Sequence, residues 1–343
     1  MVFGLLLLLI GAELSVRSAV HLAALFKIRP LIIGLTVVAM GTSAPQMAVS
    51  LQAAFSDNTD IAVGSVIGGN IFNVLVILGL CALVTPLRVA RQVLRVDIPL
   101  MIGACLLVIA LSLTGEFSKL DGVLLIAGLL VCLFVVVRQG GQVPRHGHAE
   151  TTEKPRTLTR IAMLAGGLLL LTSGGHLLVD ASVVIAINLG LSERIIGLTV
   201  IAIGTSLPAL MTSLIAAMRG ERDIAVGNVI GSNLFNLLGV LGLTALVAPV
   251  PLTISPNALV FDLPIMLGVA VLCVPLFYSG YRIDRIEGLF LLSLYLTYGL
   301  HIVSISTGML LAERLEGMML RFIVPLLGVI VAFGVVRAWR RQH

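Results

Sequence analysis

Two stretches of sequence decide the fold: GLTVVAMGTSAP at residues 34–45 and GLTVIAIGTSLP at residues 197–208. They open a gap-free internal alignment of residues 34–80 with residues 197–243, in which 28 of 47 positions are identical. The alignment closes with GGNIFN at 68–73 and GSNLFN at 231–236. Self-similarity at a fixed offset of 163 residues (197 minus 34) predicts a protein built from two copies of one unit.

Composition places both copies in a membrane. The chain is 58% hydrophobic and 11% charged, with a mean hydropathy of +1.12, whereas soluble chains carry about 25% charged residues. A water-soluble fold is excluded, and the net charge of +5 indicates contact with anionic lipid rather than with nucleic acid. Segments long enough to span a bilayer are predicted at 2–26, 31–53, 61–85, 97–114, 120–137, 161–186, 195–217, 224–247, 258–279 and 286–305, with a shorter eleventh near 322–337.

These segments predict an all-α polytopic membrane protein with two repeats of five transmembrane helices and an eleventh, C-terminal helix. We expect the first repeat at 1–137, a cytoplasmic linker at 138–160, the second repeat at 161–305 and an extra amphipathic or transmembrane segment at 306–343. Because five is odd, the second copy enters the membrane from the opposite side, which gives inverted-topology repeats.

The distribution of Lys and Arg predicts the orientation. With the N-terminus outside, 17 of the 22 basic residues fall in cytoplasmic segments and four in outer ones. The positive-inside rule therefore predicts an N-terminus outside and a C-terminus in the cytoplasm. We expect the membrane to be a bacterial inner membrane.

The repeated Gly-Thr-Ser-x-Pro motif predicts an interruption in the second and seventh helices. Proline removes a backbone donor and glycine permits non-helical dihedrals, so we expect breaks within about two residues of Ser43 and Ser206, in helices that run antiparallel and adjacent. One such motif alone is typical of a kink packed against small residues. Two copies in corresponding positions favour a transport site, because freed carbonyls and hydroxyls are hard oxygen ligands for Na⁺ or Ca²⁺.

At these motifs the chain resembles the sodium/calcium exchanger family of cation antiporters, over about residues 1–305. The resemblance implies a ten-helix core with alternating access around an ion site between the second, third, seventh and eighth helices. It also implies ion-coordinating positions, which fall on Thr42, Ser43, Gln46, Gly69, Asn73, Thr205, Ser206, Ala209, Ser232 and Asn236.

The chain departs from the family at three of these positions. The family typically carries a glutamate after each proline and often an acidic residue at a third place, where this chain has Gln46, Ala209 and Asn236. No Asp or Glu occurs in 34–56 or 197–220, and a buried divalent cation needs compensating negative charge. We therefore expect a weak, neutral site with Na⁺ as the transported cation, and Ca²⁺ or H⁺ as alternatives.

Two further pairs of ionisable residues lie within predicted spans. Glu13 and Arg17 are four residues apart on the first helix, and His176 and Asp180 take equivalent places on the sixth. Each pair lies on one helical face. Each is either a self-neutralising pair or a proton or ion relay, since buried ionisable groups are functional candidates.

Four aspartates are interpreted as helix-starting residues. Asp60 and Asp223 open the third and eighth helices and are predicted N-caps. Asp97 and Asp262 each precede a proline by two residues and are predicted to begin the fourth and ninth helices.

Two other classes of function are alternatives to transport. A degenerate family member that acts as a structural or regulatory membrane protein is favoured by the missing carboxylates. A membrane-embedded enzyme is not expected, because the chain has no His-Glu-x-x-His, no Ser/His/Asp spacing and no phosphate-binding loop. We expect no cofactor and no resident metal, and the sequence leaves the oligomeric state open.

Overall fold

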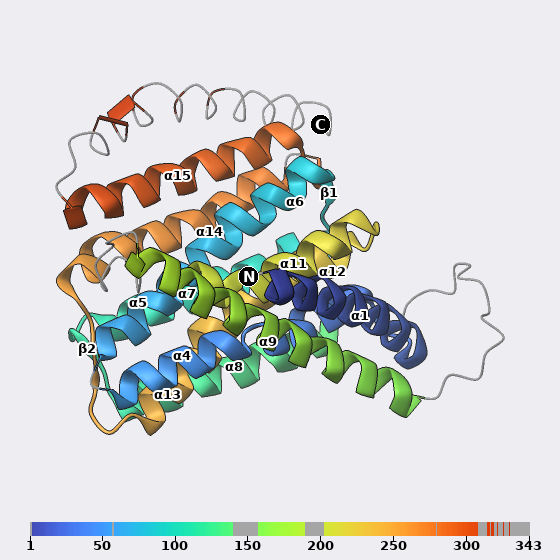
Figure 1. The fold of residues 1–343 in the computed structure, drawn as a ribbon, viewed down its shortest axis with the longest axis horizontal. Helices are drawn as coiled ribbons and strands as arrows, with labels where there is room; N and C mark the ends of the chain where they lie inside the picture. Colours follow the sequence, from blue (N-terminus) through green and yellow to red (C-terminus); the bar gives the residue numbers. More distant parts are fainter. Residues whose placement is uncertain are drawn as a thin grey trace.

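The computed structural model describes residues 2–56, 58–139, 157–188, 202–278 and 280–307, with isolated residues beyond. This part of the chain is almost entirely helical (Figure 1), as the composition predicts. Residues 140–156 of the expected linker, and most of the expected eleventh helix, lie outside the described residues.

The first half contains interrupted helices in the order of the predicted spans. Its elements, with η marking a π-helix, are α1 (Val2–Phe26), α2 (Pro30–Ile33), η1 (Gly34–Val38), α3 (Ala39–Thr42), α4 (Ala44–Phe55), α5 (Thr59–Phe72), η2 (Asn73–Leu78), α6 (Gly79–Val84), β1 (Leu87–Arg88), η3 (Val93–Asp97), α7 (Ile98–Ser112), β2 (Glu116–Phe117) and α8 (Lys119–Gln139).

The second half follows a similar order. Its elements are α9 (Thr157–Asn188), α11 (Ala202–Met218), α12 (Arg222–Leu234), η5 (Phe235–Val240), α13 (Leu241–Val247), β3 (Leu252–Thr253), η6 (Ala258–Asp262), α14 (Leu263–Tyr278), β4 (Arg282–Ile283) and α15 (Arg285–Thr307). Among the described residues, seven helices are long and apolar enough to cross a membrane, or eight if the bent run from Pro30 to Phe55 is one span.

Elements one repeat length apart make reciprocal contacts. A Cβ on Gly4 would lie 3.0 Å from the carbonyl oxygen of Gly174, and one on Gly11 would lie 2.7 Å from that of Gly167. Because Gly4 and Gly11 correspond to Gly167 and Gly174 at the offset of 163, α1 and α9 are equivalent helices that run antiparallel. Likewise β1 pairs with β4, and β2 with β3. Both patterns are those expected of inverted copies.

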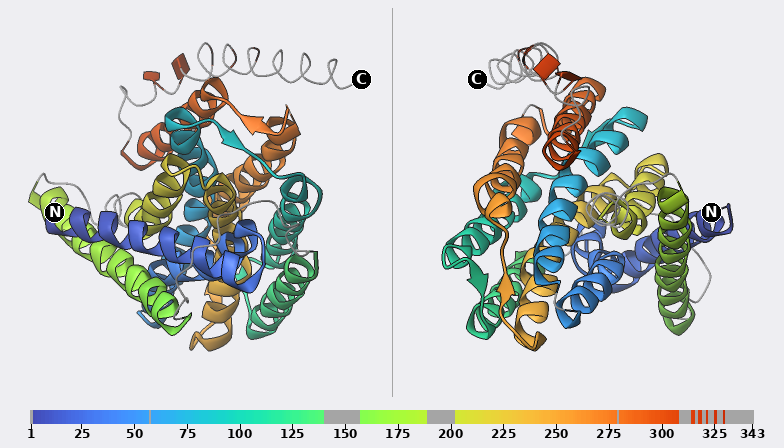
Figure 2. Two further views of the ribbon diagram at one scale, coloured as in Figure 1. Left: turned by 90° about the vertical axis from the view of Figure 1, so that its right-hand side faces the viewer. Right: turned by 60° about the vertical axis from the view of Figure 1, so that its left-hand side comes forward.

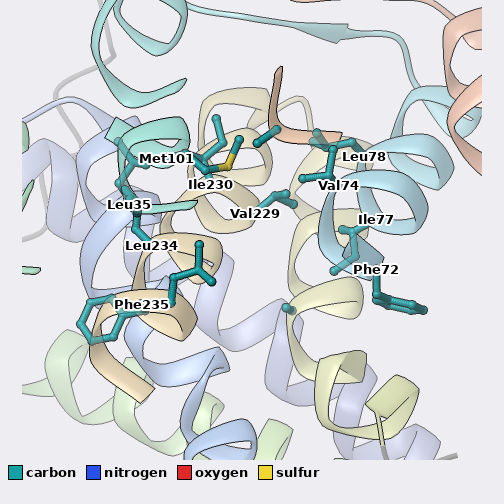
Figure 3. Close-up of a cluster of buried hydrophobic side chains, with 14 of the residues drawn as sticks. Leu35, Phe72, Val74, Ile77, Leu78, Met101, Val229, Ile230, Leu234 and Phe235 are labelled. Carbon is teal, nitrogen blue, oxygen red and sulfur yellow. The ribbon is translucent and has the colours of Figure 1, made fainter. Parts of the chain in front are cut away.

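Two spans form the centre of the molecule. Within the runs Thr59–Val84 and Arg222–Val247, 78% and 89% of an 18-residue apolar stretch is buried, whereas the corresponding share in the other five spans is 28–44%. The side chains of the two runs meet in the apolar cluster of Figure 3, where Val74 lies near Val229. The remaining helices surround this pair (Figure 2). Any site between the central helices is therefore shielded from lipid.

The predicted helix breaks differ between the halves. The helix of the first half is interrupted at Ser43, between α3 and α4, where it bends by 41°. The prediction for the second half is wrong, because α11 runs without a break through Ser206, with Pro208 inside it. Proline removes only one backbone donor, and the remaining hydrogen bonds carry α11 on through Pro208 to Met218.

The four aspartates do not start helices as predicted. Asp60 and Asp223 are each the second residue of their helix, after Asn58 and Glu221 at the N-cap positions. In the first turn they interact favourably with the positive end of the helix dipole.

The other two aspartates lie inside continuous helices. Asp97 and Asp262 end the π-helices η3 and η6, which continue directly into α7 and α14. In a π-helix each amide donates to the carbonyl five residues before it. This hydrogen-bond pattern tolerates Pro99 and Pro264, which have no amide hydrogen. The helix therefore begins before the aspartate.

Candidate ion site

The family-equivalent positions converge at the contact between the central helices, α3–α4 and α11. These positions meet at Gly69. A Cβ built on Gly69 would lie 3.6 Å from Gln46 Oε1, 3.7 Å from Ser206 Oγ and 3.9 Å from Asn236 Nδ2. No other heavy atom of a neighbour approaches closer. The site is thus a space about the size of a methyl group, lined by polar atoms from both halves. The nine non-glycine positions are between 1% and 5% exposed.

Three oxygens at the site have no hydrogen-bond partner within the described part of the chain. They are Ser43 Oγ, Asn73 Oδ1 and Asn236 Oδ1, all buried. A buried polar atom without a partner costs about 1–3 kcal/mol, and such atoms in native proteins call for an explanation such as an ion. Because they are buried and unpaired, these oxygens are the candidate ligands of the site.

Gln46 links the two halves in the first part of the site. The Thr205 hydroxyl donates to Gln46 Oε1 at 2.7 Å. The Gln46 amide nitrogen donates to Ser65 Oγ at 2.9 Å and lies 3.4 Å from Ser50 Oγ. The side chain is therefore fixed with its carbonyl oxygen toward the site.

In the second part of the site Ala209 has no polar side chain, so its only polar groups are those of the backbone. The polar side chain there is the amide of Asn228. Asn228 Nδ2 donates to the Ala209 carbonyl at 3.2 Å and to Ser213 Oγ at 2.9 Å. Its Oδ1 lies 3.0 Å from the Thr42 hydroxyl, which is also 3.3 Å from Ser232 Oγ. Sequence reasoning missed Asn228. Its only signal was the Ser-to-Asn difference from Ser65 inside an otherwise nearly identical stretch of the repeats.

A third contact joins the halves through asparagines. Asn73 Nδ2 donates to Asn233 Oδ1 at 3.0 Å, and Asn233 Nδ2 lies 3.5 Å from the Met101 sulfur. Asn73 begins η2, and Asn236 is the second residue of η5. Single π-turns inside α-helices occur frequently at functional sites, and here both copies have one.

The site carries no formal charge. None of the residues that line it is acidic, and the described residues contain no group of three or more His, Cys, Asp or Glu side chains able to hold a metal. Its amide and hydroxyl oxygens are hard ligands of the kind that Na⁺ and Ca²⁺ accept, without the compensating charge that a buried divalent cation needs.

The four candidate relay residues lie apart from this site. Glu13 forms an ion pair with Arg17 at 2.5 Å. It forms a second one with Arg219, the residue after α11, where Nε and Oε2 are 2.6 Å apart. His176 and Asp180 are exposed on α9, and no ion pair joins them in the portion of the chain that is described. The structure does not bring the two pairs together.

Comparison with known proteins gives consistent matches. A family model described as sodium/calcium exchanger protein matches residues 1–138 and 159–303. The putative antiporter CaxA of Alkalimonas amylolytica is 38% identical over 304 residues, which cover 86% of this chain and 95% of CaxA. The inner membrane protein YrbG of Escherichia coli (strain K12) is 41% identical over 280 residues, 79% of this chain and 86% of YrbG. A structure of the sodium-calcium exchanger NCX_Mj superposes with a TM-score of 0.75 at 30% identity, covering 89% of this chain and 96% of NCX_Mj.

Proposed function

Because this chain belongs to the sodium/calcium exchanger family of cation antiporters, we propose that it exchanges Na⁺ by alternating access around the site at Gly69. The site lies between α3–α4, α5–η2, α11 and α12–η5. In the membrane we propose the orientation that the basic residues predict, with the N-terminus outside.

The observation that carries this proposal is the set of three buried oxygens without partners, on Ser43, Asn73 and Asn236. Two come from the first half and one from the second. A dehydrated monovalent cation bound by these oxygens offsets the free-energy cost of burying them without partners. Cation binding thus explains why polar atoms are buried here.

Transport by alternating access requires that both halves sense the cation. The hydrogen bonds that cross between the halves at the site include Thr205 to Gln46, Thr42 to Asn228, and Asn73 to Asn233. A cation that binds one of these oxygens alters the hydrogen bond that the oxygen makes, and with it the contact between the two inverted copies. Binding is thus linked directly to the relative position of the halves.

The neutrality of the site decides the class of cation. A monovalent ion can be satisfied by amide and hydroxyl oxygens, whereas a divalent ion buried without carboxylates keeps an uncompensated charge. We therefore propose Na⁺ rather than Ca²⁺ as the ion bound at this site. A degenerate, non-transporting protein is the second candidate, and the absence of carboxylates at Gln46, Ala209 and Asn236 is the observation that favours it.

Flux measurements in proteoliposomes separate the two candidates. Purified protein is reconstituted and exposed in turn to Na⁺, K⁺, H⁺ and Ca²⁺ gradients, with Gln46→Ala/Asn236→Ala as the site variant. Thr244→Val is the matched control, because it deletes a buried hydroxyl elsewhere on the same span. We expect flux driven by a Na⁺ gradient in the wild type and in the control, and loss of it in the site variant. Equal leakage in all three and in empty liposomes would leave the degenerate role as the better account.

A further inference from the structure

We propose that Asn228 is the second-half counterpart of Gln46, so that one amide oxygen from each half binds the cation and Ala209 is not a vacant ligand position. This inference rests on the proposed function. It assigns a specificity-determining role to a residue outside the family-equivalent set.

The oxygens of the two amides have equivalent surroundings. Gln46 Oε1 accepts a hydrogen bond from Thr205, and Asn228 Oδ1 accepts one from Thr42. Thr42 and Thr205 occupy the same place in the two repeats, since their numbers differ by 163. Each amide oxygen is therefore bound by the repeat-equivalent threonine of the opposite half.

The nitrogens of the two amides are anchored in equivalent ways as well. Gln46 Nε2 lies 3.4 Å from Ser50 Oγ, and Asn228 Nδ2 lies 2.9 Å from Ser213 Oγ. Ser50 and Ser213 again differ by 163 positions. The anchoring directs both carbonyl oxygens away from the serines and toward the contact between the halves. Because a carbonyl oxygen has two lone pairs, each retains one for a cation after accepting from threonine.

The two amides come from different helices because the repeats exchange a large and a small residue. In the first half the large residue, Gln46, is on α4 and faces the small Ser65 on α5. In the second half the small residue, Ala209, is on α11 and faces the large Asn228 on α12. Position 46 corresponds to 209, and 65 to 228. Each half thus keeps one amide and one small residue across the same helix pair.

This exchange explains how Ala209 is accommodated in a well-packed site. Ala209 is 3% exposed and Asn228 is fully buried, and the asparagine amide packs on the alanine through the hydrogen bond to its carbonyl. The result is one neutral amide oxygen in each half, and each accepts a hydrogen bond from a threonine of the other half. Two neutral oxygens suit a monovalent cation, because neither brings the negative charge that a divalent cation requires.

The test rebuilds the second-half pair in the form of the first-half pair. Asn228→Ser removes the amide, and Ala209→Gln/Asn228→Ser returns one from the other helix. Ala209→Leu/Asn228→Ser is the matched control, since leucine fills the space without an oxygen. The Na⁺ KM of flux in proteoliposomes and the thermal stability of the detergent-solubilised protein are measured for each.

We expect Asn228→Ser to raise the Na⁺ KM about tenfold, the change produced by losing about 1.4 kcal/mol of binding. Ala209→Gln/Asn228→Ser returns KM to within about threefold of the wild type, since threefold corresponds to less than 1 kcal/mol. Ala209→Leu/Asn228→Ser recovers thermal stability but not KM, which a purely structural role for Asn228 does not produce. If Asn228→Ser does not fold, the comparison of the two double variants decides the question.

Two results would overturn the inference alone: an unchanged KM in Asn228→Ser, or equal rescue of KM by the leucine and glutamine double variants. A wild-type protein without Na⁺-driven flux would instead overturn the proposed function, and this role with it.

Discussion

Restoring carboxylates to the site should convert it to divalent binding, and the structure shows which substitutions this requires. Gln46→Glu keeps the oxygen that accepts from Thr205 at 2.7 Å but replaces the nitrogen that donates to Ser65 at 2.9 Å. The Ser65 hydroxyl now donates to the Ala62 carbonyl at 3.0 Å and must turn to donate to the new carboxylate. Each lost neutral bond is worth about 1 kcal/mol.

The second carboxylate needs space that the wild-type protein lacks. Ala209→Glu alone meets the amide of Asn228, whose nitrogen lies 3.2 Å from the Ala209 carbonyl, and overpacking of this kind costs about 1–3 kcal/mol. Asn228→Ser removes the obstruction and reproduces the small partner, Ser65, that faces position 46. The informative protein is therefore the triple variant Gln46→Glu/Ala209→Glu/Asn228→Ser.

The assay is Ca²⁺-dependent thermal stability, followed by Ca²⁺ flux. A ligand at about 100 times its Kd stabilises the folded state by about 2.7 kcal/mol, a shift that thermal melts resolve. We expect this stabilisation in the triple variant only, because a lone buried carboxylate without a partner charge takes up a proton. A folded triple variant with the same melting temperature in Ca²⁺ and in choline would refute the neutral-site reasoning, as would tight Ca²⁺ binding by the wild type.

Three further substitutions follow from the geometry. Gly69→Ala should fold, since its methyl group meets nothing closer than 3.6 Å, but should lower the Na⁺ affinity about tenfold because the methyl group occupies the site. The assay is a Na⁺ titration of thermal stability, with Gly68→Ala, which has no neighbour within 4 Å, as the neutral control. Ser43→Ala should raise thermal stability without Na⁺ by about 1 kcal/mol, because it removes an unpaired buried hydroxyl, and should reduce the additional stabilisation by Na⁺; stabilisation by Na⁺ equal to that of the wild type would contradict it. Gly11→Leu should destabilise the protein by about 2 to 3 kcal/mol, the upper range for overpacking, because its Cβ would lie 2.7 Å from the Gly167 carbonyl oxygen. An unchanged melting temperature would show that α1 and α9 separate easily.

The sequence predicts the helical architecture and the convergence of the two motifs, because apolar spans and repeat identity are strong, long signals. It is less informative on single turns. The motif breaks the helix at Ser43 but not at Ser206, although both precede a proline by two residues. The motif is the same in both copies, so it does not encode the difference. The π-turns and two-residue strands also leave no trace in the hydrophobic pattern.

Asn228 shows what motif matching overlooks. Position-by-position matching identifies Ala209 as a lost ligand, because it compares each position only with its own counterpart. The compensating amide comes from a different helix, and only the three-dimensional contact between α11 and α12 reveals it.

The most direct test of the neutral cation site is the position of a bound monovalent cation. Crystals of the protein soaked in Tl⁺, with and without competing Na⁺, locate the ion by its anomalous scattering. We expect one peak beside Gly69, which Na⁺ displaces. It should lie within ligand distance of the unpaired oxygens of Ser43, Asn73 and Asn236 and of the amide oxygens of Gln46 and Asn228. A peak elsewhere in the protein, or no peak at these oxygens at saturating Tl⁺, would contradict it.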